Sequence, residues 1–134
     1  MDPQDARLLA YAVEYSGLAL PEHERPHVVY LSAGQIGQLM CGSAEPGCPI
    51  EGVYFGGSSV YVLAGLNSAH GRSIIVHEFT HWLQRIVGKR ERPDTCTEAA
   101  ASERQAYAVH NRYLRTIENV TDYTYAPVLV CGAQ

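Results

Sequence analysis

A helical repeat of apolar residues between positions 73 and 87 is the feature of this sequence that most restricts its fold. Apolar side chains recur there every three or four residues, the spacing that places them on one face of an α-helix. That face consists of Ile75, Val76, Phe79, Trp82, Leu83, Ile86 and Val87. A helix with so broad an apolar face must pack against a core, and the rest of the chain has to supply that core.

The remaining sequence predicts further helices and several short strands. Helices are expected over residues 5–15, which carry a broad apolar face, and over residues 97–117, which are rich in alanine. A shorter helix is expected from Ser32, a good N-cap residue, to about Met40. Strands are expected where β-branched and aromatic residues gather, at residues 27–31, 53–55, 60–63 and 128–130.

Two of the expected strands are separated by residues that favour a turn. The segment Gly56-Gly57-Ser58-Ser59 lies between the apolar runs 53–55 and 60–63, which indicates a β-hairpin. The sequence therefore predicts an α+β fold with a small, mainly antiparallel sheet packed on the helix over residues 73–87 and on the last long helix.

Length and composition limit the classes of protein to consider. A chain of 134 residues fits a single domain spanning residues 1–134. Hydrophobic residues make up 46% and charged residues 18%, a composition typical of a folded protein. The formal net charge is −4 and no basic stripe is present, so nucleic acid is not an expected partner. No apolar run is long enough to cross a bilayer, and we expect no membrane partner.

Four cysteines allow three disulfide pairings. Cys41 and Cys48 lie close together around turn-forming Gly and Pro residues, which suggests a short disulfide loop and leaves Cys96 to pair with Cys131. An even number of cysteines in loop-like segments favours an oxidising compartment, so we expect a secreted or periplasmic protein. A cytoplasmic protein with free thiols is the alternative. Residues 1–5 have neither a basic nor an apolar stretch and do not resemble a signal peptide.

The segment His77-Glu78-Phe79-Thr80-His81 carries the chemistry of this sequence. Two histidines four residues apart project from one face of a helix and can reach one metal ion, and the apolar stripe leaves them on the other side. Zinc accepts imidazole nitrogen and favours a tetrahedral shell, so we expect one Zn²⁺ per chain. Glu78 is placed to take a proton from a water molecule at such a site and to return it to a leaving amine.

A catalytic zinc site has a third protein ligand, and the last helix offers several candidates. Glu103 shares one helical face with Ala106, Tyr107 and His110, and the small Ala106 allows a close approach of the two helices. Glu98 lies about 140° around the helix from Glu103, so both cannot easily face the ion. We favour Glu103, with Glu98, His110 and Asp94 left open. A structural alternative makes Glu103 a solvated carboxylate paired with Arg104 or Arg112.

The motif His77-Glu78-Phe79-Thr80-His81, followed by Glu103-Arg104-Gln105-Ala106-Tyr107, resembles the zincin metallopeptidases of the glutamate-ligand (gluzincin) kind. The resemblance covers about residues 50–114 and implies a zincin-like fold. It implies His77, His81 and Glu103 as zinc ligands and Glu78 as general base. The longer N-E-x-x-S-D pattern of thermolysin-like members is absent.

The resemblance also implies an edge strand that holds an extended peptide by strand addition. Residues 60–63 are the candidate for this edge, although a plain buried strand fits them equally well. A tetrahedral intermediate needs a stabiliser for its negative charge besides the metal, and the candidates are His110, Tyr107, Tyr123 and Tyr125. The other histidines, His23, His27 and His70, are interpreted as surface or loop residues.

The sequence thus predicts a zinc-dependent peptidase acting on a peptide or protein substrate. One alternative is a zinc-stapled binding or interaction module without catalysis. A second is an interaction protein in which the motif is accidental, and a third keeps the metal chemistry but hydrolyses amides of cell-wall peptides.

Overall fold

A computed structural model of the chain describes residues 1–88, 95–121 and 131. Over this part of the chain the elements are four α-helices, one short π-helix and three strands. In chain order they are α1 (Pro3–Ser16), β1 (His27–Leu31), α2 (Ala33–Ile36), the π-helix η1 (Gly37–Cys41), β2 (Gly52–Val53), β3 (Ser59–Leu63), α3 (Ala69–Ile86) and α4 (Cys96–Thr116). The predicted α+β class is confirmed. The strand expected at residues 128–130 lies outside the described residues.

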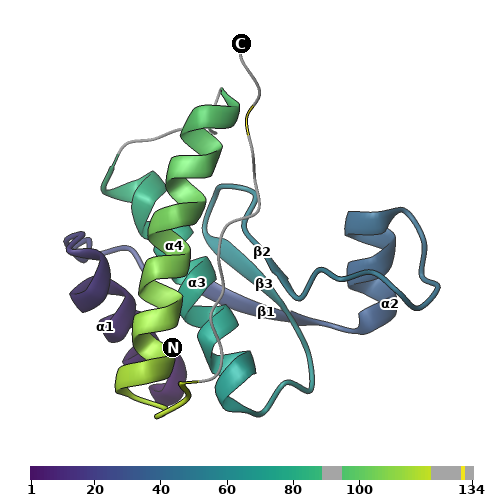
Figure 1. Cartoon of the computed structure of the whole chain (residues 1–134), viewed down its shortest axis with the longest axis horizontal. Coiled ribbons are helices and arrows are strands. Elements are labelled where there is room, and N and C mark those ends of the chain that lie inside the picture. The colour runs from purple at the N-terminus through teal and green to yellow at the C-terminus, as the bar shows by residue number, and fades with distance from the viewer. Residues whose placement is uncertain (89–94, 122–130, 132–134) are drawn as a thin grey trace.

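The sheet is mixed, so the prediction of a mainly antiparallel sheet is wrong. Its strand order is β1-β3-β2 (Figure 1). The longer pairing is parallel and joins β1 to β3 from His27 opposite Ser59 to Leu31 opposite Leu63. The expected antiparallel partner is present, but β2 is short and pairs only Gly52 with Val62 and Val53 with Tyr61. Parallel pairing is possible because the chain between β1 and β3 is long enough for a crossover connection.

The strand expected at an edge is in fact the central one. β3 lies between β1 and β2, and its side chains alternate between partly and fully buried, with Val60 and Val62 in the core. Both of its sides are therefore used in pairing, and residues 60–63 cannot receive an added strand. Among the described strands, the edges of the sheet belong to β1 and β2.

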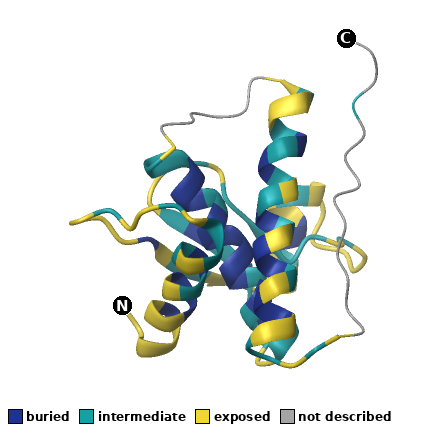
Figure 2. Ribbon diagram, turned by 60° about the vertical axis from the view of Figure 1, so that its left-hand side comes forward, coloured by how far each residue is buried: buried dark blue, intermediate teal, exposed yellow. Residues whose placement is uncertain are grey.

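α3 forms the centre of the molecule. It contacts α1, α4, β2 and β3, and Figure 2 shows the buried residues concentrated where these elements face one another. The predicted apolar stripe is the core, because Val76, Phe79, Trp82 and Leu83 are all nearly inaccessible to solvent. The opposite face of the same helix is thereby left to carry His77 and His81.

Both long helices begin earlier than the sequence predicts. α3 begins at Ala69 because the Ser68 side chain accepts a hydrogen bond from the Gly71 amide. The first turn of α3 is polar, and the start of this helix was predicted from the apolar stripe, which does not extend into that turn. α4 begins at Cys96 because Thr95, and not Thr97, caps it through the Glu98 amide.

Two disulfides are present and both match the predicted pairing. Cys41 is bonded to Cys48 at the end of η1, and Cys96 at the start of α4 is bonded to Cys131. Among the described residues, no helix has the length and apolar character needed to span a membrane.

Candidate metal centre

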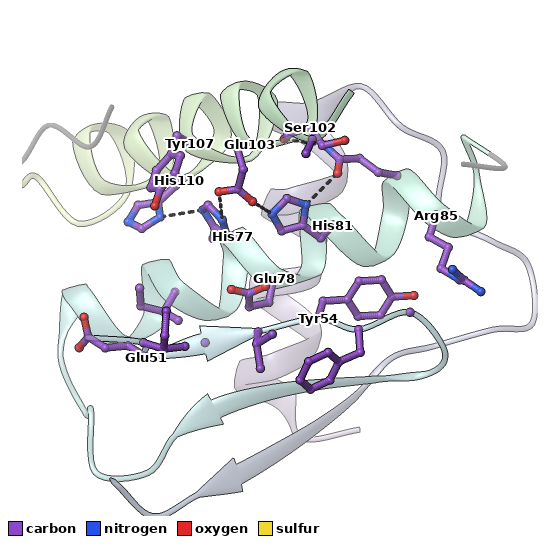
Figure 3. Close-up of a pocket in the computed structure, with 18 of the residues that line it drawn as sticks. Glu51, Tyr54, His77, Glu78, His81, Arg85, Ser102, Glu103, Tyr107 and His110 are labelled. Atoms are coloured by element: carbon purple, nitrogen blue, oxygen red, sulfur yellow. Dashed lines mark hydrogen bonds and ion pairs between the residues drawn. The ribbon is translucent and has the colours of Figure 1, made fainter. Parts of the chain in front are cut away.

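Three side chains from α3 and α4 converge on one point. The potential ligand atoms of His77, His81 and Glu103 all lie within 4.8 Å of one another. Glu103 Oε2 is 3.5 Å from Nε2 of His77, and Glu103 Oε1 contacts Nε2 of His81 (Figure 3). The histidines lie one turn apart on α3, and the fully buried Ala106 allows α4 to approach closely enough for Glu103 to face them.

Glu103 is held in its charged form by the two histidines. Partial burial of Glu103 raises the pKa of its carboxyl group, but the hydrogen bonds and positive charges of His77 and His81 outweigh burial and hold this pKa well below its usual range. The alternative of a solvated carboxylate paired with Arg104 or Arg112 is therefore wrong, because the partners of Glu103 are the histidines.

Gln84 fixes the orientation of His81. The Gln84 amide nitrogen donates to the Ser102 carbonyl oxygen (3.0 Å) and to Gln105 Oε1 (2.9 Å). Its Oε1 therefore accepts a hydrogen bond from His81 Nδ1 at 2.9 Å, which turns His81 Nε2 toward Glu103, where Nε2 donates to the carboxylate. Gln84 is not among the residues predicted from the sequence, although its position three residues after His81 on a helix is a signal for this contact.

His110 contacts the far nitrogen of His77. The two Nδ1 atoms are 3.3 Å apart, and His110 is only 1% exposed. Burial and the positive charges of His77 and His70 lower the pKa of His110 to about 3, so its ring is neutral at pH 7. Tyr107 lies beside His110 on α4, with its ring centroid 4.5 Å from that of His77 and 5.8 Å from that of His110. Two residues about one helical turn apart on α4 therefore pack together against the His77 ring.

Glu78 lies beside the three-residue group but is not one of its members. It is only 6% exposed, and this burial raises the pKa of its carboxyl group. The side chain packs against Gly52 of β2, where a β-carbon, if one were present, would come within 3.0 Å of Glu78 Oε2. The absence of a side chain at Gly52 is therefore what makes room for this carboxyl group between the helix and the sheet.

A cleft of about 700 Å³ opens over these residues. One wall is formed by α3 and α4, and the other by β2 and the residues on either side of it. Figure 3 shows Glu51 toward one end of the cleft, Arg85 and Tyr54 toward the other, and the histidines between them. Glu51 accepts a hydrogen bond from His70 Nε2 (3.0 Å). The interpretation of His70 as a surface or loop residue is therefore wrong, because it lies in the first turn of α3 and is partly buried in this pair.

The other described residues that the sequence offered as ligands or site residues do not belong to the group of His77, His81 and Glu103. Glu98 lines the cleft but does not belong to the three-residue group, and neither does His110. His23 and His27 are exposed, as predicted. Asp94, Tyr123 and Tyr125 lie outside the described residues. Of the alternatives for a third ligand that the structure describes, Glu103 is the one brought together with both histidines.

Comparisons with known proteins do not add to this picture. No family model, no curated protein and no solved structure matches the chain.

Proposed function

We propose that this protein is a zinc-dependent peptidase. The observation that carries the proposal is the convergence of His77, His81 and Glu103 within 4.8 Å beside a buried Glu78, all facing one cleft. A group that only stapled two helices together would not need an adjacent buried carboxyl group or a cleft large enough for a peptide.

The donor set fits zinc. Two imidazole nitrogens and one carboxylate oxygen are a ligand set of catalytic zinc sites, which keep a further position open. The bond from His81 Nδ1 to Gln84 supports this, because it presents His81 Nε2 as a ligand. When bound there, zinc would acidify a water molecule and stabilise negative charge on a carbonyl oxygen.

Glu78 acts as the general base in this proposal. Its carboxylate accepts a proton from the attacking water, and the same carboxyl group then returns that proton to the nitrogen of the scissile bond as the bond breaks. The packing against Gly52 holds the carboxyl group at the floor of the cleft, where water and substrate meet.

The substrate is an extended peptide that lies along β2. Because β3 is central, the strand addition first expected at residues 60–63 is transferred to β2, whose residues and flanks form one wall of the cleft. Main-chain hydrogen bonds to this wall would bind substrate without regard to its sequence.

Tyr107 and His110 have different parts in the proposal. Burial, together with the negative charges of Glu103 and Glu78, raises the pKa of Tyr107. The protonated hydroxyl can donate a hydrogen bond to the negative oxygen that forms during hydrolysis. His110 positions His77 through its Nδ1 contact.

We infer that the protein works in an oxidising compartment, as a secreted or periplasmic enzyme. The two disulfides support this inference, since such bonds persist outside the reducing cytosol.

Elemental analysis of protein purified without added metal, combined with a peptide-library digest, tests the proposed function. We expect about one zinc per chain and hydrolysis that a chelator abolishes and added zinc restores. Bound zinc without hydrolysis of any peptide would favour the zinc-stapled interaction module. No metal after reconstitution would overturn both.

A further inference from the structure

Arg85 is the one permanently charged cation among the described residues that line the cleft. It follows His81 by four residues on α3, so it lies one helical turn further along the face that carries the histidines. The carboxyl groups of the described lining are Glu51, Glu78, Glu98 and Glu103. Two of these carboxyl groups, Glu51 and Glu103, are paired with histidines, and none of the four forms an ion pair with Arg85.

No described carboxylate neutralises Arg85. The ion pairs of the described residues involve other side chains, and none of them includes this guanidinium. Arg85 is nevertheless partly buried. A guanidinium that loses water without gaining an anion is costly, and a ligand that supplies an anion there recovers part of this cost.

The guanidinium of Arg85 lies close to the backbone of the cleft wall at Gly56. A β-carbon at this position would come within 2.8 Å of Nη1. Gly56 has a φ of 96°, in the region that favours glycine. The preceding Tyr54 is fixed by a hydrogen bond from its hydroxyl to the Gly57 carbonyl oxygen (2.8 Å), and Figure 3 shows it at the same end of the pocket as Arg85.

We propose that Arg85 is a specificity-determining residue that binds a carboxylate of the substrate peptide. The inference rests on the proposed function and names its substrate class, which is peptides with an anionic group near the bond to be cleaved. Four residues of helix span about 6 Å, and an extended peptide advances about 3.4 Å per residue. The carboxylate therefore belongs to a residue within a few positions of the scissile bond.

Two sources can supply this carboxylate. One is an Asp or Glu side chain within the peptide, and the other is a free C-terminus. Both present two oxygens to the planar fork of an arginine, so the same site accepts either. The Glu51 end of the cleft, where the carboxylate is paired with His70, repels such a group and favours one orientation of the peptide.

Binding to the zinc-loaded protein tests the inference apart from catalysis. The probes are alanine-based hexapeptides with one central leucine, blocked at both ends, in which a single Asp is moved through the sequence. Each has a matched Asn peptide, and one further pair has a free or an amidated C-terminus. Calorimetry is carried out on Glu78→Gln, on Glu78→Gln with Arg85→Gln, and on Glu78→Gln with Arg104→Gln. The last is the control, because Arg104 is exposed on α4 and does not line the cleft.

We expect one position of the carboxylate to tighten binding about tenfold over its neutral partner, which is the effect of a hydrogen-bonded charge. Arg85→Gln should remove this preference and Arg104→Gln should keep it. A preferred Asp position identifies a side-chain carboxylate, and a preference confined to the free end identifies the C-terminus. Equal binding of charged and neutral peptides, a preference that survives Arg85→Gln, or no binding of any peptide would each overturn the inference.

Hydrolysis of the same peptides by the unmodified protein separates the two proposals. Cleavage without preference for a carboxylate would overturn the role of Arg85 and leave the peptidase intact. An Arg85-dependent binding preference without cleavage would support the subsite and contradict the peptidase.

Discussion

Glu78 is the residue on which the proposed reaction depends most directly. Replacing it with glutamine keeps the shape of the side chain but removes the proton acceptor. We expect Glu78→Gln to retain zinc and to lose about a hundredfold to ten-thousandfold in kcat, the usual range for a general base. Steady-state kinetics and metal analysis on one preparation measure both quantities. Full turnover by this variant would exclude Glu78 as the base.

Gly52 tests whether the position of Glu78 matters as much as its chemistry. A β-carbon at Gly52 would come within 2.6 Å of Ile74 Cγ2 and 3.0 Å of Glu78 Oε2, so Gly52→Ala must displace Ile74 and crowds the Glu78 carboxyl group. A displacement of about 1 Å can cost a hundredfold in rate, and we expect a loss of about that size with zinc retained.

Gly34→Ala is the matched control for this change. The nearest atom to a β-carbon there is Ala44 Cβ at 3.8 Å, an ordinary contact. An active Gly52→Ala enzyme with the kinetics of Gly34→Ala would show that Glu78 is not positioned by β2.

At this scale, the local sequence predicts which residues share a helical face, on α3 and on α4, but not which residues reach the site from the sheet. His77, Glu78 and His81 follow from their spacing, and the shared face of α4 indicated Glu103. Glu51 and Gly52 could not be predicted, because they reach the site through a strand far away in the sequence. Arg85 has the same helical spacing as the histidines, but its importance depends on the Gly56 wall opposite it.

At the scale of elements, the site joins α3 to α4, and Gln84 is the residue that couples them. Gln84→Leu removes the acceptor for His81 Nδ1, so we expect zinc affinity to fall about tenfold to a hundredfold. Competition with a chromophoric chelator measures this affinity.

Gln84→Glu distinguishes orientation of the ligand from packing of the helices. The glutamate keeps an acceptor for His81 but loses the donor to the Ser102 carbonyl oxygen. We expect Gln84→Glu to bind zinc more tightly than Gln84→Leu does. We also expect its free energy of unfolding to be lower than that of the unmodified protein. Equal zinc affinity in the two variants would mean that the bond to His81 has no orienting effect.

The other end of the same two helices is closed by an ion pair. Arg72 on α3 donates to both carboxylate oxygens of Glu118 (2.6 and 2.9 Å), and the Tyr113 hydroxyl contacts the same carboxylate. The hydrogen bonds from Arg72 are the main cause that lowers the pKa of Glu118, and they outweigh burial. Stability from this pair is therefore complete above the ordinary carboxyl pKa of 4.5 and is lost as the pH falls through the lowered value.

Glu118→Gln should remove this pH-dependent stability. We expect it to cost about 1–3 kcal/mol in the free energy of unfolding at pH 7, with the difference from the unmodified protein shrinking in acid. Urea unfolding at several pH values measures it. Glu14→Gln, an exposed change of the same kind on α1, is the control. If the free energy of unfolding lost in Glu118→Gln grew toward low pH, the ion pair with Arg72 would not be the source of this stability.

The sheet marks the limit of prediction at this scale. The positions of the strands follow from local composition, and the antiparallel partnership of β2 with β3 follows from the turn between them. The parallel partnership of β1 with β3 has no local pattern, because it depends on how the intervening chain crosses over. Because β1 pairs with the free side of β3, β3 is the central strand and not the edge strand that the sequence predicted.

At the scale of the whole molecule, the two disulfides contribute differently to stability. Their cysteines are separated by 7 residues for Cys41–Cys48 and by 35 residues for Cys96–Cys131. In the chain-entropy account, loops of these lengths stabilise by about 2.4 and about 4 kcal/mol. We expect the double Cys→Ser variant of the second pair to lose about 1–2 kcal/mol more than that of the first. Urea unfolding of the two variants tests this, and the reverse order would contradict it.

The parallel pairing of β1 and β3 also has a consequence for folding. β2, which forms the wall opposite Glu78, lies within the connection between these two strands. Closing a long connection costs entropy before its contacts form, so such pairings are slow steps of folding. Until the sheet closes, Gly52 is not beside Glu78 and the histidines have no second wall. We expect a newly made chain to remain inactive while it folds and to gain its activity only with the last contacts of the native state.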